Sequence, residues 1–361
     1  MTTARRNLSR RAIMQGGASS MALFAAGSPA IAQTRVTVDE ANIKPRPIAI
    51  PDFVSANPQL GRDVAQVLAA DLERSGLFKL MNPAAFPERV TSLNQTPRTR
   101  DWAAAGAEAL VVGQINQGPD GRVQVEYRLW DVVLSRNIDG KRLANPAWRR
   151  LAHIVADQVY EKLTLDKGYF DTQIVFVDEN GPKEKRVKRL AIMDQDGANL
   201  RTLSQGREIV LTPRFSPVRQ EIVYMTYIGE TPRVVTMNLA SGQRETIGNL
   251  PGATFAPRFS PDGQRLVMTF QQGATAQIVE VDMRTRQARP LTPLQSIDTG
   301  PCYSPNAREI VFESDREGTQ QLYIMGYDGS GVRRLSRGEG RYSTPVWSPR
   351  GDYIAFTKQM T

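Results

Sequence analysis

The sequence has very little thiol or imidazole chemistry: Cys302 is its only cysteine and His153 its only histidine. A single cysteine excludes an intrachain disulfide, and one residue of each kind cannot build a nitrogen- or sulfur-rich metal site. His153 falls between Leu151 and Ile154, off the main apolar face of a predicted helix, so we expect it at the boundary between the buried and the exposed face. Cys302 occupies a variable place in a repeated phrase, which favours a packing role. We therefore predict no metal and no cofactor.

Short catalytic motifs are also missing. The sequence has no Gly-x-Ser-x-Gly elbow, no His-Glu-x-x-His, no phosphate-binding loop and no dinucleotide fingerprint. Residues 194–197 (Asp-Gln-Asp-Gly) and 328–331 (Asp-Gly-Ser-Gly) resemble calcium loops, but both follow the third strand of a repeat. The spacing therefore predicts tight hairpin turns at both places, and we predict that the protein is not an enzyme.

No apolar run reaches the roughly 20 residues that a membrane-spanning helix needs. The apolar stretch near the start is shorter and follows Arg10 and Arg11, so residues 1–32 are predicted to be a signal peptide of twin-arginine type, cleaved after Ala32. An ordinary secretory signal is the alternative. Residues 1–32 hold four arginines and no acid, so their removal lowers the net charge from +9 to +5. That mild, dispersed charge argues against nucleic acid as a partner.

What the sequence does contain is a repeat. The phrase Pro-x-aromatic-Ser-Pro begins at Pro213, Pro257, Pro301 and Pro345, with a constant spacing of 44 residues. Three apolar runs keep the same period, which gives four short strands in each repeat. A period of about 40–45 residues with four strands is typical of β-propeller blades. An array of hairpins or a β-sandwich is the alternative, but neither requires one period at four positions.

The two ends of the repeat domain, residues 169–361, are incomplete. One period before Pro213, the segment that begins at Tyr169 lacks the phrase, so the first unit has strands two to four only. The fifth unit stops after its second strand. Because an open ring would leave unpaired strand edges, we expect that the sequence is a fragment of a longer propeller.

Residues 33–168 are predicted to form a separate α/β domain. Pro47–Pro51, Leu77–Leu80 and Ala109–Gly113 read as strands, and a hairpin follows around Gly118–Gly121. Apolar residues at helical spacing predict one helix near residues 60–72 and a second from about Pro146. Two helices against one sheet are therefore expected before the propeller.

Propeller geometry indicates where a partner would bind. The first strand of each blade lines the central channel, and the segment that enters it lies at the channel mouth. These entering segments are predicted to be loops at residues 210–212, 254–256, 298–300 and 342–344. Their sequences vary while the strands repeat, as expected for a scaffold that carries a recognition surface.

The combination resembles the TolB family of the Tol–Pal system. The motifs are Phe-Ser-Pro-Asp-Gly at residues 259–263, Arg-Pro-Ile-Ala-Ile-Pro at 46–51, Leu-Glu-Arg-Ser-Gly-Leu-Phe at 72–78 and Ile-Val-Phe-Glu-Ser-Asp-Arg at 310–316. The resemblance covers essentially the whole mature chain. It implies a six-bladed propeller after the α/β domain and a non-enzymatic periplasmic adaptor. This chain would stop within the fifth blade.

The resemblance also implies two partners, the lipoprotein Pal at the propeller mouth and TolA at the N-terminal arm, in support of outer-membrane integrity and of constriction during cell division. The residues carried over for Pal are Thr254, Phe255, Ala256, Asp298, Thr299, Gly300, Tyr342, Ser343 and Thr344. Those for TolA are Gln33, Thr34, Arg35, Val36, Thr37 and Val38. We expect a monomer. The alternative is the propeller domain of an exported peptidase or glycan-binding protein.

Overall fold

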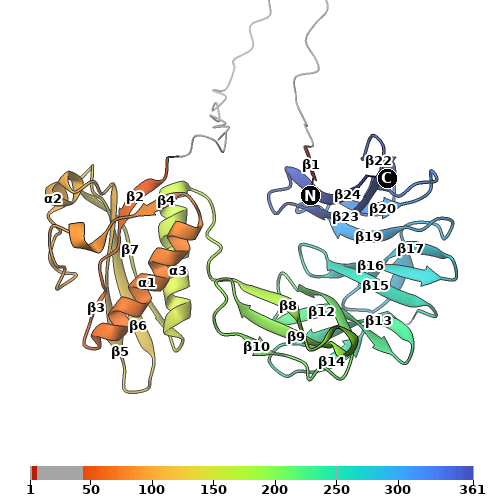
Figure 1. The fold of residues 1–361 in the computed structure, drawn as a ribbon, viewed down its shortest axis with the longest axis horizontal. Helices are drawn as coiled ribbons and strands as arrows, with labels where there is room; N and C mark the ends of the chain where they lie inside the picture. Colours follow the sequence, from red (N-terminus) through yellow and green to blue (C-terminus); the bar gives the residue numbers. More distant parts are fainter. Residues whose placement is uncertain (1, 6–43, 249, 361) are drawn as a thin grey trace, which may run out of the picture. The chain divides into compact units, whose positions relative to one another are not determined.

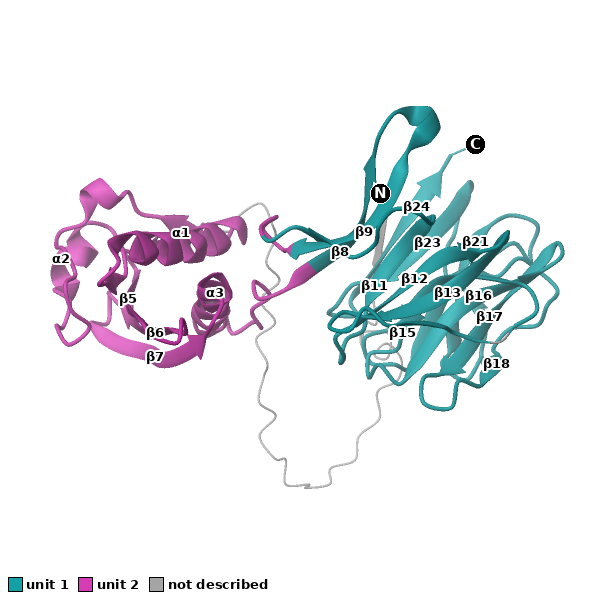
Figure 2. Ribbon diagram, turned by 90° about the horizontal axis from the view of Figure 1, so that it is seen from below, with its two compact units in different colours: residues 1–20, 174–193, 199–361 teal, residues 21–173, 194–198 magenta. Residues whose placement is uncertain are grey.

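The computed structural model describes residues 2–5, 44–248 and 250–360. In this part of the chain, no helix is both long and apolar enough to cross a membrane. The chain divides into two compact units, coloured separately in Figure 2. The N-terminal unit takes residues 21–173 together with residues 194–198, and the propeller unit takes residues 1–20, 174–193 and 199–361.

The N-terminal unit is built on a mixed sheet with the strand order β4-β2-β5-β6-β7, in which β3 also pairs with β5. The strand β2 pairs in parallel with β4 and with β5, and β3 pairs in parallel with β5, whereas β5, β6 and β7 form an antiparallel meander. Their bounds are β2 Arg46–Ala49, β3 Val54–Ser55, β4 Phe78–Leu80, β5 Ala109–Gln117, β6 Val123–Asp131 and β7 Arg136–Asn145. The expected strands and hairpin are confirmed; β3 and β7 were not predicted.

Helices α1 (Pro58–Arg74) and α3 (Trp148–Thr164) pack against each other and cover one face of this sheet (Figure 1). The start of α1 is set locally: the Asn57 side chain accepts hydrogen bonds from the backbone N–H groups of Gln59 and Leu60, and Pro58 opens the first turn. After the helix, Gly76 has φ +74°, the left-handed conformation that commonly ends helices. The two expected helices are thus confirmed.

The sheet is buried on both faces. On the α1 and α3 face, side chains such as Leu68, Tyr127 and Val155 form the larger core. On the other face, a smaller core surrounds Trp102 on α2 (Thr99–Ala104), a short helix that the sequence analysis missed. The segment between β4 and α2, which includes the 3-10 helix η2 (Pro83–Ala85), also packs on this second face through Phe86 and Val90.

The propeller unit contains three complete four-stranded antiparallel sheets, as the period predicted. The first strands are β11 Val210–Phe215, β15 Ala253–Phe259 and β19 Thr299–Tyr303, and the second strands are β12 Glu221–Ile228, β16 Arg265–Gln272 and β20 Glu309–Ser314. The third strands are β13 Thr231–Asn238, β17 Thr275–Asp282 and β21 Gln321–Gly326, and the fourth are β14 Arg244–Thr246, β18 Ala288–Pro290 and β22 Arg333–Arg334.

Two further sheets are smaller. The first has the order β10-β9-β8, with β8 Gln173–Asn180, the 3-10 helix η3 Lys183–Lys185, β9 Val187–Asp194 and β10 Arg201–Thr202, so it lacks a first strand as expected. The last holds β23 Arg341–Trp347 and β24 Tyr353–Gln359. In the full chain β1, Thr2–Arg5, pairs with β24; these residues belong to the predicted signal peptide.

The serine of the repeated phrase explains why the phrase recurs. In each copy, the serine N–H donates to the carbonyl oxygen five residues later, as in Ser260 to Arg265 and Ser304 to Glu309, both at 2.8 Å. In these two copies the serine hydroxyl also accepts a backbone N–H from the same residue. Each serine thereby closes the turn between the first and second strands of its blade.

Candidate functional site

The start of each first strand contains a β-bulge. Register breaks lie between Leu211 and Arg214, between Phe255 and Arg258, and at the matching places in β19 and β23. The residue before the repeated proline has a positive φ in all four copies: Thr212, Ala256, Gly300 and Thr344, with φ of 48–61°. Bulges bend a strand and redirect its side chains. Residues 210–212, 254–256, 298–300 and 342–344 were predicted to be loops, but most of them lie in strands. Each first strand stays paired with the second strand on both sides of its bulge.

The structure separates the residues carried over for Pal into two groups. Thr254, Asp298 and Tyr342 are buried, with 0%, 0% and 4% of their surface exposed. Phe255, Ala256, Thr299, Gly300 and Ser343 are half-buried, and Thr344 is exposed. Thr254, Asp298 and Tyr342 are therefore interior residues, and only the second group presents surface at these strand starts.

Asp298 is held by an arginine. Its carboxylate accepts both a hydrogen bond from Ser296 at 2.8 Å and hydrogen bonds from Arg316 at 3.0 and 3.1 Å. The Arg316 guanidinium also lies 4.8 Å from the ring centre of Tyr323. Thr254 has a similar structural role, because its hydroxyl accepts the backbone N–H of Val234 at 3.0 Å. The hydrogen bonds of Thr254 and Asp298 therefore hold the starts of two first strands, β15 and β19, at the mouth.

Glu313 on β20 links two neighbouring mouth segments. Burial raises the pKa of its carboxyl group, against hydrogen bonds from Thr299, Gln320 and the Thr344 backbone that lower it. A Cβ atom on Gly300 would lie only 2.8 Å from the Glu313 carboxylate, so a larger residue here would require the Glu313 side chain to move. No sequence pattern pointed to Glu313, because it belongs to a predicted core strand and lies far in sequence from Thr344.

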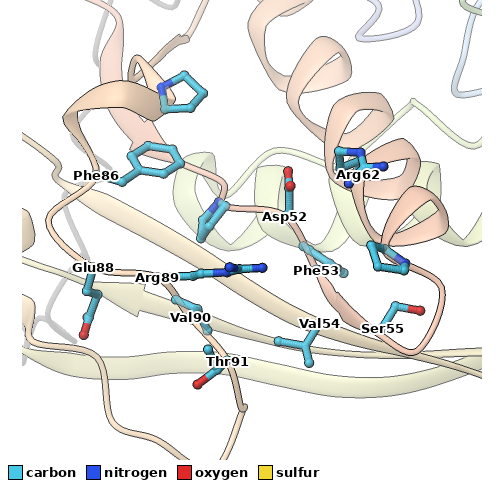
Figure 3. Close-up of a pocket in the computed structure, with 13 residues that line it drawn as sticks. Asp52, Phe53, Val54, Ser55, Arg62, Phe86, Glu88, Arg89, Val90 and Thr91 are labelled. Carbon is cyan, nitrogen blue, oxygen red and sulfur yellow. The ribbon is translucent and has the colours of Figure 1, made fainter.

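The N-terminal unit has a separate pocket of about 500 Å³. Phe53, Val54, Phe86 and Val90 line it together with the ionic side chains of Asp52, Arg62 and Arg89, and Figure 3 shows Arg89 reaching from its loop toward Phe53. Phe53 packs against bare backbone, since a Cβ atom on Gly113 would lie 2.1 Å from its ring. The arrangement could accommodate an apolar group flanked by an ionic one. No motif pointed to this pocket.

A buried ionic cluster lies in the same unit. A hydrogen bond of 2.6 Å joins His153 Nδ1 on α3 to Asp71 Oδ2 on α1, and Asp196 lies on the other side of the imidazole, 3.7 Å from Nε2. Arg149 pairs with Asp196, and Gln195 and Arg74 donate to the second Asp71 oxygen at 2.8 and 3.2 Å. The expectation of a boundary histidine is wrong: His153 is 2% exposed.

The cluster also extends the prediction for residues 194–197, which was a tight hairpin turn. They do form a tight turn, closed by the Gly197 N–H on the Asp194 oxygen at 2.9 Å. In addition, Gln195 and Asp196 bind α1 and α3. Ligand atoms of Asp71, His153 and Asp196 lie within 4.8 Å of one another, a spacing that could hold a cation. The guanidinium groups of Arg149 and Arg74 already pair with the carboxylates of Asp196 and Asp71, so the two negative charges are balanced without a bound cation.

This cluster predicts a pH dependence. Burial acts to lower the pKa of His153, but Asp71 and then Asp196 raise it above its usual value. Its folded-state pKa is therefore higher than its unfolded one, so its contribution to stability is complete below about pH 6.5 and is lost as the pH rises through the folded value. We expect His153→Gln to lower the urea midpoint more at pH 5.5 than at pH 9, as measured by circular dichroism. An equal loss at both pH values would contradict this.

Two family models match the chain. The TolB amino-terminal domain matches residues 34–138, and the TolB β-propeller domain matches residues 160–361. The chain belongs to the TolB family. The recognition made from the sequence motifs is thereby confirmed, as is an α/β domain followed by a propeller.

Two individual TolB proteins are similar to the chain. The Tol-Pal system protein TolB of Paramagnetospirillum magneticum is 55% identical over 236 residues, which are 64% of this chain and 53% of that relative. The matched stretch thus spans about half of the curated relative. The crystal structure of TolB from Acinetobacter baumannii is 31% identical with a TM-score of 0.76, over 88% of this chain and 78% of that one. The likeness extends over both units.

Proposed function

We propose that the chain is a non-enzymatic adaptor of the Tol–Pal system in the periplasm. In this proposal it binds Pal at the propeller mouth and TolA through the N-terminal arm, residues 33–38, and so supports outer-membrane integrity and constriction during division. Membership of the TolB family supports the assignment to this system. The match to the TolB amino-terminal domain favours it over a peptidase or glycan-binding propeller, since the chain carries both TolB domains.

The observation that carries the Pal assignment is the rigid, repeated construction of the mouth. Buried Thr254 and Asp298 hold the strand starts, while Thr299 and Thr344 present polar groups on the same end of neighbouring blades. A surface that is ordered before binding loses little conformational entropy on association. The mouth is therefore suited to a folded partner that docks as a rigid body.

The TolA assignment uses a different physical mechanism. The arm lies outside the described residues, and the argument for it comes from its sequence, in which Val36 and Val38 alternate with polar residues. An extended segment of this kind can add to the edge of a partner's sheet, where backbone hydrogen bonds give affinity. Binding by the arm and binding at the mouth would then involve separate residues.

A crossed experiment tests both assignments. Thr299→Arg places a long cation beside the mouth and should weaken Pal binding at least about tenfold, or about 1.4 kcal/mol, while TolA binding stays unchanged. Deletion of residues 33–38 should weaken TolA binding and leave Pal binding unchanged. Affinities would be measured by calorimetry with purified Pal and TolA, after circular dichroism has verified that each variant is folded.

Thr285→Arg is the matched control. The strand registers place Thr285 at the opposite end of a blade, since Arg265 pairs with Asp282 there, whereas Gln272 pairs with Thr275 at the mouth end. This control should bind Pal as the unmodified chain does. Pal affinity that is unaffected by Thr299→Arg, or TolA affinity that survives loss of the arm, would refute the corresponding half of the proposal.

A further inference from the structure

The strand β3 of the N-terminal unit has a partner strand on one side only. Val54 pairs with Gln114 and Ser55 with Ile115, both on β5. The preceding strand β2 pairs with the same strand β5 and is covered on its outer side by β4. After Leu80 the chain leaves the line of β4, so among the described residues no strand pairs with the outer side of β3. The sheet therefore has an open position beside β3.

The pocket of about 500 Å³ lies at this open position. Both residues of β3 line it. It is also lined by Phe53, from the core beneath α1 and α3, and by Phe86 and Val90, from the core on the opposite face of the sheet. A cavity that reaches both faces of a sheet lies at the edge of that sheet. The backbone N–H and C=O groups of such an unpaired edge can pair with another extended chain.

One wall of the pocket is held in place by bonds within the N-terminal unit. The Glu88 carboxylate is 7% exposed and accepts the backbone N–H of Arg98 at 2.8 Å and the indole N–H of Trp102 at 2.9 Å. The Arg98 guanidinium also pairs with Glu88 at 3.1 Å and balances its charge. The segment that carries Phe86 and Arg89 is thereby fixed, and a cavity that is formed before binding loses little conformational entropy on association.

The remaining charged side chains of the pocket favour an acidic ligand. Arg62, Arg89 and Asp52 line it, two positive groups against one negative group. All three are exposed, and among the described residues none of them forms an ion pair with another. Figure 3 shows the segment from Asp52 to Ser55 passing between Arg62 and Arg89. Because successive side chains of a strand point to opposite faces, acidic residues on either face of a strand added beside β3 would meet an arginine.

We propose that this pocket binds an extended acidic peptide segment of a partner protein, which adds to the sheet as a strand beside β3. Backbone hydrogen bonds to β3 would supply affinity, while carboxylates at Arg62 and Arg89 and apolar side chains at Phe86 would select the sequence. The site is separate from the propeller mouth and from residues 33–38. It gives the N-terminal unit a binding role of its own, beyond the proposed adaptor function.

The test measures fluorescence anisotropy of a fluorescein-labelled peptide, Thr-Glu-Val-Glu-Val-Glu-Thr with blocked ends, as the full chain is added. We expect saturable binding, and the same peptide with glutamine in place of glutamate should bind at least about tenfold more weakly. Two further peptides carry an N-methyl group on the central glutamate or on the valine after it. Successive N–H groups of a strand point to opposite sides, so one of these two peptides should lose at least about tenfold in affinity and the other much less.

Substitutions in the pocket should act in opposite directions. Arg89→Gln should weaken binding of the glutamate peptide at least about tenfold, because a positive charge is lost, whereas Asp52→Asn should strengthen it, because a negative charge is removed. Arg136→Gln is the matched control: Arg136 is exposed on β7, the strand at the opposite edge of the same sheet. It should bind the peptide as the unmodified chain does.

The outcomes separate this site from the other proposed sites and from other occupants. Thr299→Arg and the chain without residues 33–38 should both bind the peptide normally, whatever their effect on Pal and TolA. Unsaturable binding, equal affinity of both N-methylated peptides, or an equal loss in Arg136→Gln would overturn the proposal. Light scattering that shows a dimer, which Arg89→Gln dissociates, would assign the pocket to a second copy of the chain and also overturn it.

Discussion

Replacing Asp71 with alanine is expected to lower the free energy of unfolding of the N-terminal unit by about 3–5 kcal/mol near pH 6. Asp71 is completely buried on α1, where it accepts hydrogen bonds from His153, Gln195 and Arg74. Its removal leaves a buried imidazole without its counter-charge. The loss should be smaller at pH 9, where an unpaired His153 is neutral and costs less to bury.

Urea unfolding followed by circular dichroism at 222 nm is a suitable measurement, because α1, α2 and α3 all belong to the N-terminal unit. Glu73→Ala is the matched control: it removes a carboxylate two residues away on the same helix, at an exposed position. We expect it to change the free energy of unfolding by less than about 0.5 kcal/mol. A loss for Asp71→Ala as small as that of the control would show that the cluster contributes little to stability.

Trp102→Ala should have an effect of similar size, about 3–5 kcal/mol, for a different reason. The Trp102 side chain is 0% exposed and fills the smaller core, with its ring centre 5.1 Å from that of Phe86. Its Nε1–H donates to Glu88 Oε1 at 2.9 Å. Truncation therefore leaves a cavity and removes one of the hydrogen bonds that hold Glu88.

This substitution should also disturb the pocket of the N-terminal unit. Glu88 accepts the backbone N–H of Arg98 at 2.8 Å and so holds the segment from which Phe86 and Arg89 line the pocket. We expect limited proteolysis to cleave this segment faster in Trp102→Ala. Trp102→Phe keeps the packing but not the hydrogen bond, so its loss of stability should be smaller.

Trp148→Ala serves as the control for aromatic truncation, because Trp148 is only half-buried and packs at the edge of the larger core. It should cost clearly less stability than Trp102→Ala and leave proteolysis of the pocket segment unchanged. If Trp102→Ala and Trp148→Ala lowered the free energy of unfolding equally, burial of Trp102 on the second face of the sheet would not be what holds the pocket segment in place.

The strands and helices that carried clear local patterns were predicted well. The helix α1 follows from the spacing of Leu60, Val64 and Leu68, and the blades follow from a phrase whose serine bonds to the residue five positions later. Such signals are local, so they can be read without knowing the fold. The strand β7 was missed because its residues are mostly exposed and polar; its pairing with β6 holds it in place.

The mouth of the propeller was located from the repeat, but the roles of its residues were not. A period of 44 residues fixes which positions are equivalent, yet it does not say that Asp298 is buried beneath Arg316 while Thr299 is accessible. That distinction depends on side chains from other strands.

By itself, then, the sequence determined the two-part organisation, the repeated blades of the propeller and the TolB family, because repeats and family motifs are properties of the chain taken in order. Tertiary structure alone decided the meeting of Asp71, His153 and Asp196 and the depth at which each mouth residue lies. These features arise from contacts between residues far apart in sequence, where burial changes the cost of a charge and no local pattern records it.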